Sequence, residues 1–135
     1  MTEITLEAKI ENVRQVTDFI DAELEKLDCP MKIQLQMDVA VDELFSNISM
    51  YAYPGAVGQA TVRFSFDAAC RAVSVTLIDS GVPYDPLKKE DPDVTLSAEE
   101  RQVGGLGIFL VKKTMDDMVY ERRGQQNVLT IIKKI

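Results

Sequence analysis

The sequence contains no histidine and only two cysteines among its 135 residues. Without histidine, neither a Ser-His-Asp triad nor a Cys-His pair can form, and histidine-liganded zinc or haem is excluded as well. Cys29 and Cys70 lie far apart and can build neither a disulfide framework nor a four-ligand metal site. We therefore interpret both as packing thiols of a protein in a reducing compartment.

Long apolar runs and excess positive charge are also missing. No stretch approaches the ~20 apolar residues of a membrane span, and residues 1–16 intersperse acids where a signal peptide would have an apolar run. The 15 Lys and Arg against 22 Asp and Glu leave a net charge of −7, which argues against binding DNA or RNA through phosphates. We expect a cytoplasmic protein that binds neither membranes nor nucleic acids.

Hydrophobic periodicity assigns most of the chain to regular elements. The first helix is expected to begin at an N-cap, Asn12, with Gln15 completing a capping box, and to end before Pro30. The strands are expected at 2–8, 60–67, 72–79, 118–122 and 128–135, and the other helices at 31–51 and 104–117. Four basic residues are assigned to strand surfaces: Arg122, Arg123, Lys133 and Lys134.

The order of these elements predicts an α+β fold. The simplest arrangement that buries every apolar stripe is a two-layer sandwich, with a mostly antiparallel mixed sheet and the helices packed on one face. The other face of the sheet would be left for solvent or a partner. A chain of this length buries roughly two-thirds of its unfolded surface and needs no second domain, so residues 1–135 are interpreted as one domain.

Two motifs carry carboxylates that are candidates for chemistry. Glu43 and Asn47 are four residues apart on a helix and so are neighbours on one stripe; this pair suits a hydrated magnesium ion or is simply a solvated helix face. Asp79 follows a strand and precedes Ser80-Gly81. It is either part of a common turn or a carboxylate facing a pocket, where it would accept a hydrogen bond from an amino group such as that of adenine.

A third motif is the glycine-rich segment 104–107, Gly-Gly-Leu-Gly, at the expected start of a helix. Open backbone N–H groups at a helix N-terminus favour an anion such as a phosphate chain; the alternative is a tight turn that permits close packing. The segment is neither a Walker motif nor a dinucleotide fingerprint. Before it, residues 80–103 lack periodicity, and a loop of this length is typical of a functional lid or a disordered insert.

In their order along the chain, the three motifs resemble those of the GHKL ATPase superfamily, which includes gyrase, MutL and histidine-kinase catalytic domains and has the Bergerat ATP-binding fold. Over nearly its whole length the chain is similar to the anti-sigma factor serine kinases. Four phrases carry this similarity: Ala40-Val41-Asp42-Glu43-Leu44-Phe45-Ser46-Asn47, Tyr51-Ala52-Tyr53, Asp79-Ser80-Gly81-Val82-Pro83-Tyr84-Asp85-Pro86 and Gly105-Leu106-Gly107-Ile108-Phe109-Leu110-Val111.

The resemblance implies a role for each motif residue. Asn47 would ligate a magnesium ion on the ATP phosphates, and Glu43 would be the catalytic general base toward the attacking hydroxyl. Asp79 would bind the adenine amino group and Gly81 would border the base. The phosphates would lie under a lid at about 83–103, against the backbone of Gly104, Gly105, Leu106 and Gly107.

The same resemblance implies partners. Members of this family transfer the ATP γ-phosphate to a serine of a STAS-type anti-anti-sigma protein, sequester a sigma factor and are commonly homodimers. We therefore expect an ATP-dependent protein serine/threonine kinase that also acts as a switchable binding protein. Three alternatives stay open: a regulatory module that binds ATP or ADP without phosphotransfer, a histidine-kinase catalytic module acting in trans, and an interaction domain whose motifs are coincidental turns.

Overall fold

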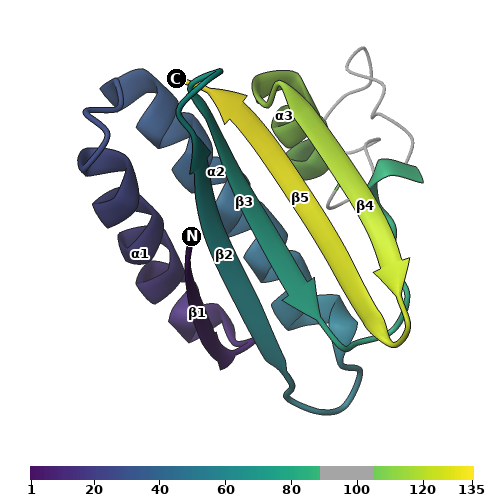
Figure 1. Cartoon of the computed structure of the whole chain (residues 1–135). Helices are drawn as coiled ribbons and strands as arrows, with labels where there is room; N and C mark the ends of the chain where they lie inside the picture. Colours follow the sequence, from purple (N-terminus) through teal and green to yellow (C-terminus); the bar gives the residue numbers. More distant parts are fainter. Residues whose placement is uncertain (89–104) are drawn as a thin grey trace.

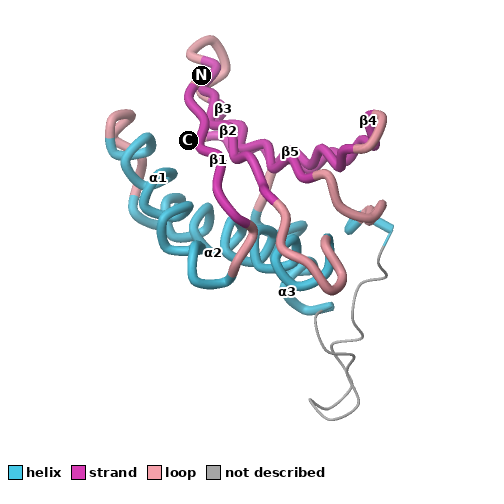
Figure 2. The backbone as a smooth tube through the Cα atoms, turned by 90° about the horizontal axis from the view of Figure 1, so that it is seen from below, coloured by secondary structure: helices cyan, strands magenta, loops and turns pink. Residues whose placement is uncertain are grey.

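The chain forms two layers, a sheet and a set of helices that cover one of its faces (Figures 1 and 2). The computed structural model describes residues 1–88 and 105–135. The main elements are β1 (Thr2–Glu7), α1 (Val13–Glu25), α2 (Met31–Asn47), β2 (Gln59–Asp67), β3 (Ala72–Asp79), α3 (Gly105–Thr114), β4 (Asp117–Arg123) and β5 (Gln126–Lys134). Shorter turns of helix lie at Ile10–Asn12, Ile48–Ala52 and Pro86–Lys88.

The sheet has five strands in the order β1-β2-β3-β5-β4, and every described pair is antiparallel. The expected α+β sandwich with helices on one face is confirmed, whereas no parallel pair of a mixed sheet occurs among the described strands. β3 and β5 lie at the centre of the sheet, between β2 and the edge strand β4. Each of these two central strands is therefore paired with a neighbouring strand on both sides.

The hydrophobic core lies between the sheet and the helices. Each fully buried aliphatic side chain contributes about 1.5–3 kcal/mol relative to an exposed one. α2 is the central helix and contacts both α1 and α3, so it buries more than the single stripe expected from its periodicity. The largest fully buried side chains come from both layers: Phe45, Ile20, Leu24, Met37, Leu77, Ile108 and Ile131.

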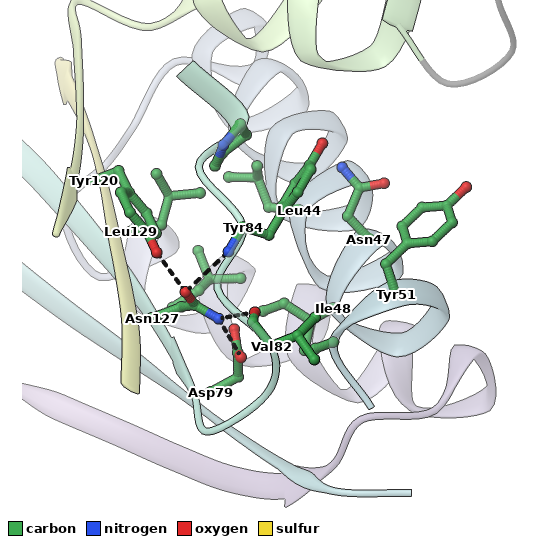
Figure 3. Close-up of a pocket in the computed structure, with 13 residues that line it drawn as sticks. Leu44, Asn47, Ile48, Tyr51, Asp79, Val82, Tyr84, Tyr120, Asn127 and Leu129 are labelled. Atoms are coloured by element: carbon green, nitrogen blue, oxygen red, sulfur yellow. Dashed lines mark hydrogen bonds between the residues drawn. The ribbon is translucent and has the colours of Figure 1, made fainter. Parts of the chain in front are cut away.

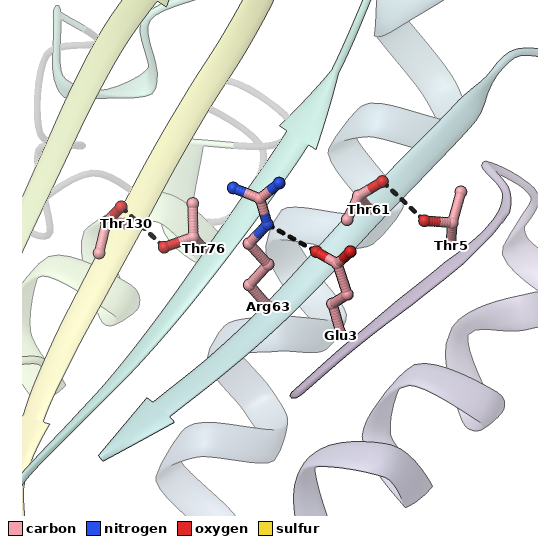
Figure 4. Close-up of polar contacts among 6 residues, drawn as sticks. All are labelled: Glu3, Thr5, Thr61, Arg63, Thr76 and Thr130. Atoms are coloured by element: carbon pink, nitrogen blue, oxygen red, sulfur yellow. Dashed lines mark hydrogen bonds and ion pairs between the residues drawn. The ribbon is translucent and has the colours of Figure 1, made fainter. Parts of the chain in front are cut away.

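The opposite face of the sheet is polar where neighbouring strands exchange side-chain contacts (Figure 4). The Thr5 and Thr61 hydroxyl groups are 2.8 Å apart, and those of Thr76 and Thr130 are 3.0 Å apart. Arg63 donates to Glu3 across β1 and β2 at 2.6 Å. No described helix covers this face, so these cross-strand pairs hold the strands together at the surface.

Two helix ends differ from the sequence prediction. Asn12 does not cap α1 through its side chain; its amide instead donates to the Glu7 carbonyl at 2.8 Å, because a short 3₁₀ turn precedes the helix. The second helix does not run unbroken to residue 51. It ends at Asn47 and continues as one π-helical turn, Ile48–Ala52, which widens the backbone beside the candidate site.

Three further assignments are corrected by side-chain contacts. Cys70 is exposed and Cys29 only partly buried, so Cys70 is not a packing thiol. Lys133 is not a plain surface residue, because its ammonium group donates to the Thr114 carbonyl at 2.7 Å and so satisfies the C-terminal end of α3. Arg122 is also not confined to the strand surface, since its guanidinium donates to the Gly81 carbonyl at 2.9 Å.

Between α1 and α2, the carboxyl groups of Asp21 and Asp38 lie together. One oxygen of each is buried and accepts no hydrogen bond from the described residues. Burial, the hydrogen bond that the protonated Asp38 carboxyl group donates to Asp21, and the charges of Asp21 and Asp18 raise the pKa of Asp38 from 3.8 to about 8. The folded chain therefore holds a proton there that the unfolded chain has already released near neutral pH.

This shared proton predicts a pH-dependent stability. Because the folded-state pKa is the higher one, the contribution is complete below the unfolded value and is lost as the pH rises through about 8. Relative to wild type, Asp38→Asn should be more stable by a few degrees in melting temperature near pH 8, with the difference shrinking toward acid pH. Thermal melts of both proteins across this range test it; a difference that does not change with pH contradicts it.

Candidate functional site

The last turns of α2 present the first two candidate side chains. Leu44 and Phe45 are buried and anchor this part of the helix against the sheet, so its polar neighbours have a defined direction. Glu43 and Asn47 are both half-buried and lie one turn apart. The Asn47 carboxamide makes no side-chain hydrogen bond to any described residue and lines a pocket beside the helix.

Asp79 is the last residue of β3 and is only 6% exposed. Its Oδ1 accepts two hydrogen bonds, from the backbone N–H of Gly81 and from the amide of Asn127, both at 2.9 Å. Its Oδ2 accepts none from the described residues. A buried carboxylate with one satisfied and one open oxygen is suited to receive a hydrogen bond from a ligand.

Asp79 and Asn47 line the same pocket (Figure 3). Its walls are mostly apolar, with a few polar groups, which is typical of small-molecule sites. Four parts of the fold contribute: α2 with its π-helical turn, the end of β3, the segment that follows β3, and the β4–β5 hairpin. The lining residues are Leu44, Asn47, Ile48, Tyr51, Ala52, Leu77, Asp79, Val82, Tyr84, Pro86, Tyr120, Asn127 and Leu129.

Gly81 lies beside this pocket and is not among its lining residues. A Cβ at Gly81 would overlap the backbone and Cβ of Ala52 in the π-helical turn. The absence of a side chain lets the two segments touch, and the Val82 N–H donates to the Ala52 carbonyl at 2.9 Å. The Asp-x-Gly motif thus joins the end of β3 to the end of α2.

Tyr53 reinforces this junction from the other side. Its hydroxyl group donates to the Gln59 carbonyl at 2.6 Å and accepts a hydrogen bond from the Ser80 N–H at 2.8 Å. Burial raises the pKa of the Tyr53 hydroxyl, with a smaller opposing effect of the Ser80 N–H. The hydroxyl therefore stays protonated and links the starts of β2 and of the segment after β3.

The glycine-rich motif begins α3 and reaches the helix that carries Glu43. The helix starts at Gly105, while Gly104 and most of the expected lid lie outside the described residues, as does the side chain of Leu106. A Cβ at Gly107 would overlap the carboxyl group of Glu43. The missing side chain therefore makes room for this carboxylate against the first turn of α3.

Two tyrosines stand at the pocket mouth. Tyr51 and Tyr84 are 52% and 38% exposed, and the Tyr84 ring lies on the same side of the pocket as Leu44 and Asn47 (Figure 3). Burial raises the pKa of Tyr84, followed by the charges of Tyr51, Glu43 and Asp85. The charge of the candidate base, Glu43, thus acts on a side chain that lines this pocket.

The sequence analysis did not identify Tyr120, Asn127 or the role of Arg122. Asn127 is 5% exposed and pairs in register with Asp79 across β3 and β5. A signal was present, because Asn127 shares the inward side of the strand with Leu129 and Ile131, where a polar residue is unexpected. Its partners come from three other segments and could not be read from the strand itself.

Comparison with known proteins places this chain in a family. Residues 6–133 match the family described as the histidine kinase-like ATPase domain, and the chain belongs to it. The chain is 30% identical over 101 residues to the serine/threonine-protein kinase BtrW of Bordetella bronchiseptica, covering 74% of this chain and 70% of BtrW. It is also 30% identical over 86 residues to the serine-protein kinase RsbW of Bacillus cereus, covering 61% of this chain and 52% of RsbW.

A solved structure supports the same fold. The histidine kinase domain of the blue-light activated histidine kinase EL346 from Erythrobacter litoralis superposes with a TM-score of 0.59. The two sequences are 17% identical, and the superposition covers 90% of this chain and 60% of that one. The expected GHKL fold and the relationship to protein serine kinases are confirmed. No helix in the described residues combines the length and apolar character needed to cross a bilayer.

Proposed function

We propose that this chain is an ATP-dependent protein serine/threonine kinase that modifies a STAS-type anti-anti-sigma protein. The observation that carries the proposal is the pocket shared by Asp79 and Asn47, next to the helix that bears Glu43. Membership of an ATPase family whose relatives include protein serine kinases supports it.

In this proposal, the adenine base enters the apolar part of the pocket. The open Oδ2 of Asp79 accepts a hydrogen bond from the 6-amino group. Leu77 and Leu129 provide apolar contact for the base. The triphosphate runs toward the first turn of α3, where Gly105, Leu106 and Gly107 offer backbone N–H groups, with Gly104 preceding the helix.

The residues present fit a magnesium ion that arrives with the nucleotide. Asn47 offers an amide oxygen that no described residue engages, and magnesium prefers such hard oxygen ligands while keeping waters and phosphates as its others. Asn47 would be the protein ligand of this ion. Among the described residues, no cluster of three acidic, cysteine or histidine side chains offers another site for it. When bound, the ion would neutralise phosphate charge during transfer.

The transfer step requires a base close to the terminal phosphate. Glu43 accepts the proton of the substrate serine hydroxyl as its Oγ forms a bond to the γ-phosphorus. The bond between that phosphorus and the bridging oxygen of ADP breaks, leaving phosphoserine and ADP. Gly107 leaves room for this carboxylate against α3, because it has no side chain. Because phosphoryl transfer depends mainly on positioning and charge stabilisation, this small set of groups supports slow turnover.

The binding partners in this proposal follow from the family resemblance. The same chain would also bind a sigma factor and work as a homodimer. Two surfaces could contact such partners: the polar face of the sheet and the apolar groove between α2 and α3. No described helix covers this face of the sheet.

Transfer of radiolabelled γ-phosphate tests the proposed function. The purified chain, magnesium and ATP are incubated with the STAS-type proteins encoded in the same genome, and phosphoserine is identified by mass spectrometry. Label on one STAS-type protein supports the proposal. ATP binding without label on any of them favours the regulatory module that binds nucleotide and does not transfer phosphate. Absence of ATP binding overturns the proposal altogether.

A further inference from the structure

We propose that Asn127 is a positioning residue that fixes the orientation of the Asp79 carboxylate and thereby makes the pocket selective for a 6-amino purine. The inference rests on the proposed function, since it concerns how the same pocket recognises its base. It is carried by the contacts of one buried carboxamide on β5 (Figure 3).

Asn127 uses all of its hydrogen-bonding capacity within the protein. Its amide group donates to Asp79 Oδ1 and to the Val82 carbonyl, both at 2.9 Å. Its carbonyl oxygen accepts from the Tyr84 N–H at 3.3 Å and from the Tyr120 hydroxyl. A carboxamide has two donors and two acceptor positions, so none remains for a ligand. Asn127 therefore acts through Asp79 and does not contact the base itself.

The network also determines which way the Asn127 amide points. Its amide group faces two acceptors, and its oxygen faces a backbone donor and a hydroxyl group. Exchanging its nitrogen and oxygen would bring acceptors against acceptors at Asp79 and Val82, which is unfavourable in a buried site. The donor is thus held on Asp79 Oδ1.

With Oδ1 engaged, the rotation of the Asp79 carboxylate is restricted from two sides. The Gly81 N–H and Asn127 both bind this oxygen, which leaves Oδ2 as the open acceptor. An acceptor-only position favours a donor such as the 6-amino group of adenine. A 6-oxo group would place two acceptors together, and a site built for a donor rejects such an analogue strongly.

The β4–β5 hairpin makes further hydrogen bonds to the segment after β3. Asn127 binds Val82 and Tyr84, and Arg122 donates to the Gly81 carbonyl. These contacts tie the pocket wall to the C-terminal hairpin at three residues, Gly81, Val82 and Tyr84. We infer that the hairpin sets base selectivity, although its residues lie far in sequence from the Asp-x-Gly motif.

Binding of ATP and of inosine triphosphate, which carries a 6-oxo group, tests the inference. Dissociation constants are measured by isothermal titration calorimetry in the presence of magnesium. The wild-type chain should prefer ATP by about 100-fold or more. Asn127→Leu should lower this ratio by at least about tenfold, because a hydrogen bond to a charged group is lost. A general loss of structure would weaken the binding of both nucleotides equally and leave the ratio of their dissociation constants unchanged.

Two further variants keep the test decisive if Asn127→Leu fails to fold. Asn127→Asp retains the shape but replaces the donor facing Asp79 by an acceptor, and should lose ATP selectivity too. Tyr120→Phe removes one donor to the Asn127 oxygen and should lower the ratio by a smaller factor, about threefold. Thr130→Val is the matched control, since this β5 side chain contacts Thr76 on the opposite face of the sheet (Figure 4).

The possible outcomes separate this inference from the proposed function. A wild-type ratio retained by a folded Asn127→Leu or Asn127→Asp variant overturns the positioning role while leaving ATP binding intact. A wild-type chain that binds both nucleotides equally overturns selection through Asp79. A wild-type chain that binds neither nucleotide overturns the proposed function, and this inference with it.

Discussion

Replacing Glu43 by alanine is expected to lower phosphotransfer by about 10²–10⁴-fold while leaving ATP affinity within a few-fold of wild type. The carboxylate is the proposed acceptor of the serine proton, and it lies against Gly107 at the first turn of α3. In the proposed site, other groups would hold the nucleotide, namely Asp79, Asn47 and backbone N–H groups. The loss should therefore appear in kcat and hardly in ATP binding, measured by single-turnover transfer and by calorimetry.

Gly107→Ala offers an independent route to the same defect. The added methyl group would collide with the Glu43 carboxyl group and push it aside, while every backbone N–H of the turn is kept. Alanine also favours helix formation over glycine by roughly 1 kcal/mol, so the variant should not lose stability through α3. It should reduce transfer without removing the base.

Asp42→Ala is the matched control for both variants. Asp42 precedes Glu43 on α2 but is exposed, and within the described residues its carboxylate accepts a single local hydrogen bond, from Ser46. Its removal should leave transfer at the wild-type rate. A Glu43→Ala protein that phosphorylates its partner as fast as wild type would assign the base to another group.

Replacing Asn47 by alanine is expected to weaken magnesium-dependent ATP binding by roughly 100-fold or more. Asn47 is the proposed protein ligand of the ion, and even losses of residues that only support a metal ligand commonly cost 10–100-fold in affinity. The Asn47 amide makes no hydrogen bond to any described residue, so its removal should hardly change the melting temperature. Affinity should be measured with magnesium and with excess chelator.

The dependence on magnesium separates the role of Asn47 from a general effect on the pocket. Binding of ATP in the presence of chelator should be similar for Asn47→Ala and wild type, because Asp79 and the apolar walls remain. Ser46→Ala, one residue away and outside the pocket lining, is the control and should behave as wild type under both conditions. An Asn47→Ala protein with undiminished magnesium-dependent affinity contradicts the assignment.

Much of the fold could be predicted because its patterns are local. Apolar residues recur at every second position, as in Val62 and Phe64 or Val73 and Val75. This pattern predicts strands, and these side chains are buried in the structure. Helix ends were harder, because they depend on contacts outside the helix. The Asn12 side chain bonds back to Glu7, and Lys133 reaches the end of α3 from a strand.

The candidate site was also predictable only in part. Glu43, Asn47 and Asp79 are recognisable as motif residues, and the structure brings Asn47 and Asp79 into one pocket and places Glu43 at Gly107. Gly81 was expected to border the base, yet its missing side chain makes room for Ala52, which lies in a turn distant in sequence. Close packing of this kind has no local signature.

The sequence by itself determined the two layers, the order of the elements and the position of each motif on a helix or at a strand end. These properties follow from backbone periods of 3.6 and 2 residues and from residue type, which act over a few neighbours. Only the tertiary structure decided that Asn127 and Arg122 bind the segment after β3 and that Tyr120 binds Asn127. Hydrogen-bond partners of a buried side chain are set by which strands become neighbours, and that depends on the whole sheet.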